Sequence, residues 1–236
     1  MPQILRSSDS DGRVVLPDHA VRSGARTTAD GALELESIEI GPGHELVFES
    51  NEPLRVSVGR LEIADGGTIS VRAPLDLTVA QFVATTPSVV VVGPDGAPGP
   101  RGASAGSGPG GRGGTGGGGG PAFGANFQFD TISGTFIVIA RGGRGGRGGD
   151  GGAGGGARQR GGNGGDGGPG GDGSAIQIYY QTLAPDTNFQ IDTAPAQGGE
   201  GGDGGPGGQP DGPTGLPGER GASGKPSTVV IRQIQT

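Results

Sequence analysis

Glycine occupies two of every three positions over residues 141–173, where the chain reads RGGRGGRGGDGGAGGGARQRGGNGGDGGPGGDG. Glycine loses more backbone freedom on folding than any other residue, so such a run folds only when specific contacts hold it. Similar glycine-rich blocks lie at 93–124 and 198–226. Because the three blocks contain almost no apolar side chains, they cannot belong to a hydrophobic core.

A period of three matches the polyproline II helix, which has three residues per turn, a rise of about 3.1 Å per residue and no internal hydrogen bonds. Polyglycine adopts the same helix, and its N–H and C=O groups can bond to neighbouring helices because no Cβ stands in the way. We therefore expect two glycine edges to face other helices and the third position to face solvent. Each excursion of about 30 residues can run out and back as two legs of roughly 45 Å. The alternative is that the blocks are disordered, as low-complexity glycine sequence often is.

Short runs of alternating apolar and polar residues, separated by turn signals such as GPG at 41–43, fill residues 32–92 and also bracket each glycine block. Such runs predict many short strands and almost no α-helix. We expect an all-β fold: β-sandwich or β-solenoid strands carrying three glycine-rich excursions packed as a polyglycine-II helix bundle. The expected parts are a polar N-terminal arm at 1–31, a β module at 32–92 and a strand-anchored glycine-rich domain at 93–236.

Charged residues of the second block fall on two edges of the expected leg pair. Arg141, Arg144 and Arg147 share an edge of the outgoing leg, and Asp166 and Asp172 share an edge of the return leg. Antiparallel folding predicts ion pairs between Arg141 and Asp172 and between Arg147 and Asp166. Each exposed pair contributes at most about 1 kcal/mol, so these pairs would fix register more than stability.

The period-three pattern resembles the polyglycine-II bundles of T-even-like phage tail-fibre adhesins and of the snow flea antifreeze protein. This resemblance covers the three glycine blocks and rests on periodicity. Residues 93–104 and 212–226 also resemble collagen, because they are written in G-X-Y triplets. The resemblances imply a stiff bundle without an apolar core, in which proline stiffens some of the legs.

The sequence favours neither an enzyme nor a nucleic-acid-binding protein. The chain has two His, no Cys and no Ser in a nucleophile-elbow sequence, so we expect no catalytic residues. The run RGGRGGRGG resembles an RNA-binding RGG box, but it lacks interleaved aromatic residues and the chain carries a net charge of −7. Gly-Gly-x-Gly-x-Asp at 145–150 resembles the start of a calcium-binding RTX repeat without its apolar position. We expect no cofactor, with calcium as the alternative.

No apolar stretch approaches the 18 residues that a membrane-spanning helix needs, and the first residues show no signal-peptide pattern. We therefore expect no membrane insertion, and a place outside the cell, at the cell surface or in a virion.

The leading hypothesis is a non-enzymatic structural protein, a subunit of a self-assembling extracellular filament, spike or fibre, whose first 31 residues dock on a neighbouring copy. The alternative is a phage-type tail-fibre adhesin that recognises a cell-surface receptor through the loops at the tips of the glycine bundle. The candidate tip residues are Arg158, Gln159, Arg160, Gln209 and Asp211.

Overall fold

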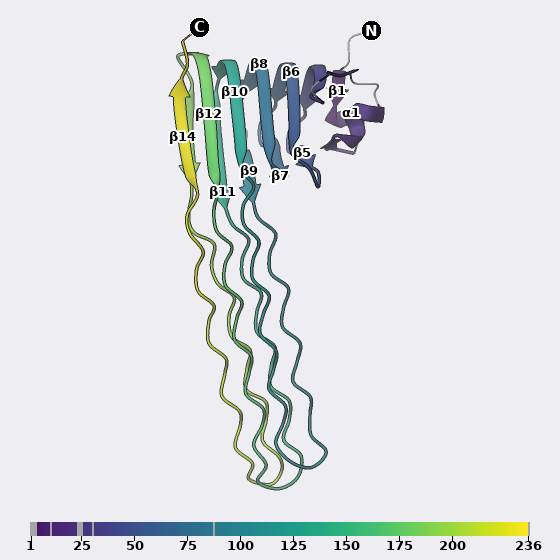
Figure 1. Cartoon of the computed structure of the whole chain (residues 1–236), viewed down its shortest axis with the longest axis vertical. Helices are drawn as coiled ribbons and strands as arrows, with labels where there is room; N and C mark the ends of the chain where they lie inside the picture. Colours follow the sequence, from purple (N-terminus) through teal and green to yellow (C-terminus); the bar gives the residue numbers. More distant parts are fainter. Residues whose placement is uncertain (1–3, 10, 23–25, 30, 87, 236) are drawn as a thin grey trace.

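The computed structural model describes residues 4–9, 11–22, 26–29, 31–86 and 88–235. A β body lies at one end of the molecule, and a rod of long glycine-rich segments projects from it (Figure 1). Within the described residues, the helical elements are α1 (Asp18–Arg22) and the 3₁₀ turn η1 (Ser7–Asp9). The expectation of a nearly all-β chain is therefore confirmed. No helix in this part of the chain is long and apolar enough to cross a membrane.

The body consists of two sheets in which every strand pair is parallel except that of β3 with β4. The larger sheet contains eight strands: β1 (Ile4–Arg6), β3 (Arg26–Thr27), β4 (Leu33–Ile40), β6 (Leu54–Ile63), β8 (Leu75–Ala84), β10 (Ala125–Ser133), β12 (Ala175–Leu183) and β14 (Thr228–Gln233). The smaller sheet contains six: β2 (Arg13–Leu16), β5 (Glu45–Glu49), β7 (Thr68–Arg72), β9 (Ser88–Val92), β11 (Thr135–Arg141) and β13 (Asn188–Asp192).

From β4 onwards the chain visits the two sheets in turn, so each circuit adds one strand to each sheet. Short connections join successive strands, such as 41–44 between β4 and β5 and 50–53 between β5 and β6. Because these connections cannot carry the chain back along a strand, the strands of the two sheets run in opposite directions (Figure 1). The parallel pairs are thus formed between successive circuits.

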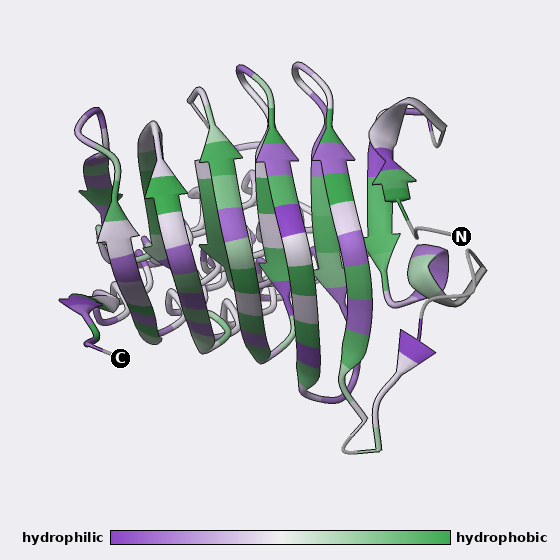
Figure 2. Ribbon diagram, turned by 90° about the horizontal axis from the view of Figure 1, so that it is seen from above, coloured by the Kyte–Doolittle hydropathy of each residue, from purple (hydrophilic) through white to green (hydrophobic). Residues whose placement is uncertain are grey.

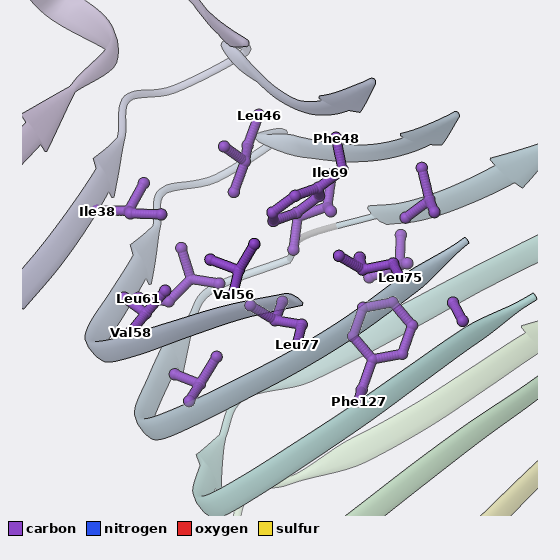
Figure 3. Close-up of a cluster of buried hydrophobic side chains, with 14 of the residues drawn as sticks. Ile38, Leu46, Phe48, Val56, Val58, Leu61, Ile69, Leu75, Leu77 and Phe127 are labelled. Atoms are coloured by element: carbon purple, nitrogen blue, oxygen red, sulfur yellow. The ribbon is translucent and has the colours of Figure 1, made fainter. Parts of the chain in front are cut away.

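Apolar side chains from alternate strand positions fill the space between the sheets (Figure 3). Hydrophobic and hydrophilic residues alternate along the strands (Figure 2), and in β6 and β8 this alternation becomes a burial pattern in which buried and exposed residues largely alternate. Buried residues also align from circuit to circuit: Val56 pairs with Leu77, Leu77 with Phe127 and Phe127 with Ile178. Burial of this continuous apolar column drives the folding of the body.

The glycine blocks leave this stacking intact. Leu54 pairs with Leu75, 21 positions further on, whereas Leu75 pairs with Ala125 across the first glycine block, 50 positions further on. Each block leaves the body after a strand of the smaller sheet and returns to the next strand of the larger one. The second and third blocks follow the same route, so all three excursions leave from the same end of neighbouring circuits.

The N-terminal residues do not form the expected polar arm. Strand β1 pairs with β4 and β2 pairs with β5, so both belong to the sheets of the body. Leu5, Val14 and Leu16 are buried in its core, as is Ala20 of α1. The arm was a wrong prediction because these strands are short and interrupted, and only their sheet partners reveal which apolar residues are covered.

Candidate functional site

Six extended segments, here called legs 1 to 6, form the rod (Figure 1). Their ranges are leg 1 (93–104), leg 2 (109–121), leg 3 (142–154), leg 4 (160–173), leg 5 (197–208) and leg 6 (212–226). Odd-numbered legs run away from the body and follow β9, β11 and β13. Even-numbered legs return to β10, β12 and β14.

Backbone hydrogen bonds join the legs at every third residue. Between antiparallel legs 1 and 2, the N–H of Gly114 donates to the C=O of Pro100 at 2.8 Å, and the N–H of Gly117 donates to Ala97 at 2.7 Å. Between parallel legs 1 and 3, the N–H of Gly96 donates to the C=O of Arg144 at 2.8 Å. The same spacing joins legs 2 to 3, 3 to 4, 4 to 5 and 5 to 6, and in parallel 3 to 5, 2 to 4 and 4 to 6. The legs therefore form two layers, one of odd and one of even legs.

The glycines of the legs are needed for space more than for backbone conformation. Among the glycines of the three blocks, a positive φ is found at Gly108 and Gly156, which lie where the chain reverses. A Cβ added to Gly116 would fall on the C=O of Gly146, far inside contact distance. A Cβ added to Gly118 would lie 3.5 Å from the side chain of Pro169, an ordinary contact. Side chains are thus excluded between legs and accepted on the outer position of each triplet.

The collagen-like triplets form the two edge legs. Leg 1 has neighbours in legs 2 and 3, and leg 6 has neighbours in legs 4 and 5. An edge leg needs one glycine per triplet: Gly218 donates its N–H to Gly202 of leg 5, and an added Cβ would collide with Gly165 of leg 4. Pro217, which precedes this glycine, lies exposed on the outer side of leg 6, where its missing N–H is not required. The difference between GGX and GXY repeats therefore follows from the number of neighbouring legs.

The ion pairs of the legs are not those expected from the sequence. Asp166 pairs with Arg112 at 2.9 Å, and Asp172 lies 3.8 Å from Lys225. Arg147 pairs with Asp203 at 2.7 Å and with Asp150 at 2.9 Å. The predicted partners were wrong because, apart from the Arg147–Asp150 pair within leg 3, charged side chains meet along a layer, between legs of successive excursions.

The two other arginines of the predicted edge lie on the odd-leg layer. Arg141 ends β11 and is partly exposed, and its C=O accepts the N–H of Gly93. Arg144 is exposed, and its N–H donates to the carboxylate of Asp95 at 2.7 Å. No ion pair of either arginine is found in the described part of the chain.

Outward-facing carboxylates and one amide accept the N–H groups that face solvent on the next leg of the same layer. The N–H of Glu219 donates to Asp166, and that of Leu216 donates to Asn163, both at 3.0 Å. The N–H of Asp203 donates to Asp150 at 3.0 Å, and this bond, helped by the Arg147 guanidinium, holds the pKa of Asp150 below its usual value. These side chains satisfy backbone donors that the glycine network leaves outside.

These contacts were missed because the predicted pairs joined residues within one glycine block. The informative quantity is the number of positions that separate contacting residues in successive blocks. Asp166 and Glu219 are 53 positions apart, as are Ile176 and Val229, which pair in the body. The length of a full circuit, body strands and glycine excursion together, therefore sets which outward residues meet on the rod.

The candidate tip residues lie together at the far end of the rod. The N–H of Arg158 donates to the C=O of Pro210, and the N–H of Gly208 donates to the C=O of Gln159, both at 2.8 Å. Gln159 is half-buried, while Arg158, Arg160, Gln209 and Asp211 are exposed. Arg158 and Asp211 both have a φ of 62°, a conformation that favours glycine.

The first reversal joins the same surface. Gly108 and Gly155 exchange backbone hydrogen bonds of 3.0 and 2.8 Å. The three reversals therefore form one continuous tip.

Both histidines lie in the body and are partly buried, His19 in α1 and His44 just before β5. His44 Nδ1 lies 2.8 Å from the hydroxyl of Ser7, which accepts the N–H of Gly41. Ser7 is 1% exposed, so its hydroxyl group lies inside the body. The N–H of Val15 donates to Nδ1 of His19 at 3.0 Å. Within the described ranges, no group of three or more His, Cys, Asp or Glu side chains is arranged to hold a metal ion.

Comparisons with known proteins give little information about this chain. No family model matches it, and no curated protein matches it. One solved structure is described as a nine polyproline type II helical bundle springtail antifreeze protein from Granisotoma rainieri. It is 27% identical, and the match covers 59% of this chain and 97% of that one, with a TM-score of 0.14. A TM-score this low carries no argument about the fold.

Proposed function

We propose that this chain is a non-enzymatic structural protein, a subunit of a self-assembling extracellular filament, spike or fibre. In this proposal the body is a two-sheet β-solenoid and the rod is a polyglycine-II bundle. The observation that carries the proposal is the period-three hydrogen bonding of all six legs. Such a rod keeps its shape without an apolar core, which suits a part that is displayed away from the body.

The proposal also covers the partner, the location and the ligands of the protein. Its main partner is a further copy of the chain, and it acts outside the cell, at the cell surface or in a virion. It involves no nucleic acid, no membrane insertion and no cofactor. The body supports this view because its large side chains serve packing: five phenylalanines are fully buried (Phe48, Phe82, Phe127, Phe129 and Phe136).

Electron microscopy of the purified full chain tests the proposal. We expect regular assemblies in which rods of uniform length project from, or run along, a common axis. Particles that stay single at every concentration, with no ordered assembly, would contradict self-assembly. Flexible threads in place of rods would contradict the bundle.

A second candidate function, the adhesin, is favoured by the conformation of the tip. Arg158 and Asp211 are exposed side chains held at positive φ, where glycine would cost less. Backbone strain of this kind tends to persist where a side chain has a role. The chemistry offered is one cationic and one anionic group at the end of a long rod.

The variants Arg158→Gly and Asp211→Gly separate binding from folding. Because glycine accepts positive φ, both variants should be at least as stable as the original chain. If the tip binds a cell surface, attachment of labelled protein to cells falls at least tenfold in both. Glu200→Gln, on leg 5 away from the tip, is the matched control and should bind normally. Unchanged attachment in the tip variants, or no attachment by the original chain, would rule out this second function.

A further inference from the structure

The two ends of the β body differ in how they are covered. At the end formed by the first circuits, β1 and the antiparallel β3 share one edge of β4. Helix α1 lies at the same end, and its Ala20 is fully buried (Figures 1 and 2). Short, interrupted and antiparallel elements of this kind prevent further strands from adding in register.

The opposite end, formed by β13 and β14, carries no such cover in the described residues. Strand β14 is the last strand of the larger sheet, and β13 is the last of the smaller one. The N–H of Thr228 donates to the C=O of Ser174, just before β12, and the N–H of Ile234 donates to the C=O of Tyr180 in β12. By the alternation of a strand, the backbone groups of Val229 and Ile231 point to the open edge.

The apolar column of the body is also exposed at this end. Ile191 pairs with the buried Val138, so its side chain faces the space between the sheets, yet it is 48% exposed. Phe189, Val229 and Ile231 pack against the core and are only partly buried. Exposed core positions next to unpaired strand edges mark an interaction surface.

We propose that a second copy of this chain covers this end, with β14 of one copy antiparallel to β14 of the other about a two-fold axis. This inference rests on the proposed function and specifies one contact of the assembly, the one that joins two copies into a closed pair; growth beyond the pair needs a further contact. Because one end of the body is covered and the other is open, head-to-tail stacking of bodies is blocked. A two-fold axis instead places the open end of one copy against the open end of the other. The edge of β14 carries both N–H and C=O groups, so two antiparallel copies of β14 can bond to each other.

Charge supports the same arrangement. Arg232 is the charged residue of β14, and pairing centred on Val230 or Ile231 places it opposite an uncharged residue of the other copy, not opposite Arg232. Gln233 of β14 pairs with Tyr180 of β12, near the carboxyl end of both strands. The loop at 184–187, which follows β12, therefore lies just past the carboxyl end of β14. Antiparallel pairing therefore brings exposed Asp186 of one copy towards exposed Lys225 of the other.

Sedimentation of the full chain tests the contact. We expect a dimer whose dissociation constant rises at least tenfold in Ile191→Glu, because two carboxylates then meet at the covered core. Leu216→Glu is the matched control, since Leu216 is 58% exposed on leg 6 away from this end. It should leave the dimer unchanged.

Disulfide cross-linking reports the pairing itself, since the chain contains no cysteine. Either Val230→Cys or Ile231→Cys should give a linked dimer under mild oxidation, and Gln128→Cys on the outer face of β10 should give none. Ordered assemblies that persist in Ile191→Glu, without cross-links through β14, would overturn this contact and leave the proposed function standing. A chain that sediments as a monomer at every concentration would overturn both.

Discussion

At the scale of single residues, the rod depends on the absence of side chains between its legs. The run of five glycines at 116–120 contains both kinds of position: Gly116 faces leg 3, and Gly118 is exposed towards solvent. The two residues share neighbours in sequence and differ in what a methyl group would meet. They therefore allow a matched test of the bundle.

We expect Gly116→Ala to destabilise the rod by about 1–3 kcal/mol, because backbone atoms of leg 3 must move to make room. Gly118→Ala should be neutral or stabilising by up to about 1 kcal/mol, because alanine restricts the unfolded chain. Hydrogen exchange of the leg amides measures both. Equal protection in the two variants would mean that legs 2 and 3 are not in contact.

At the scale of the leg, outward acidic side chains hold neighbouring legs in register. Asp166 accepts the N–H of Glu219 and pairs with Arg112, so it contacts legs 2 and 6 from leg 4. Asparagine keeps an oxygen that can accept the N–H and removes the charge. Alanine removes both contacts.

Asp166→Ala should destabilise the rod by about 1 kcal/mol, the value of a typical hydrogen bond with a small contribution from the exposed ion pair. Asp166→Asn should cost less than half of that. Thermal unfolding of the two variants, followed by hydrogen exchange at Glu219, distinguishes the two contributions. A loss in Asn equal to that in Ala would assign the effect to the charge and not to the backbone contact.

The sequence predicted where strands and extended legs occur better than it predicted which of them lie side by side. Alternating Leu, Ile and Val residues predicted the strands, and the glycine period predicted extended legs with one outward position. The predicted ion pair between Arg147 and Asp166 was wrong because the partners of a charged residue depend on which legs share a layer. The length of a full circuit, strands and glycine excursion together, sets which residues of those legs meet. The arm at 1–31 was wrong because strands of three and four residues carry almost no periodic signal.

At the scale of the whole molecule, the body and the rod are stabilised by different physics. The described hydrophobic core belongs to the body with a few residues at its junction with the rod, whereas the legs are joined through backbone hydrogen bonds. The legs also leave and re-enter the body at fixed strand ends, which holds them side by side. The body should therefore fold without the rod, while the rod depends on the body.

Replacing the segments 93–124, 142–174 and 193–227 with four-residue connections like the one at 50–53 tests this dependence. We expect the shortened chain to keep its β-sheet circular dichroism signal and a cooperative thermal transition. The same three segments joined directly, without the strands of the body between them, should be disordered and rapidly cleaved by protease. An unfolded shortened chain, or a protease-resistant chain of joined segments, would contradict this order of dependence.

The three-residue spacing of the contacts between legs also restricts how such a rod can change in length. Insertion of one or two residues in a leg would turn side chains inward and shift every later contact, whereas a whole triplet restores the pattern. One triplet adds about 9 Å, and it must be added to all six legs for their ends to stay level. Rod length in such a molecule is therefore inherited in discrete steps, and the three excursions must lengthen or shorten together.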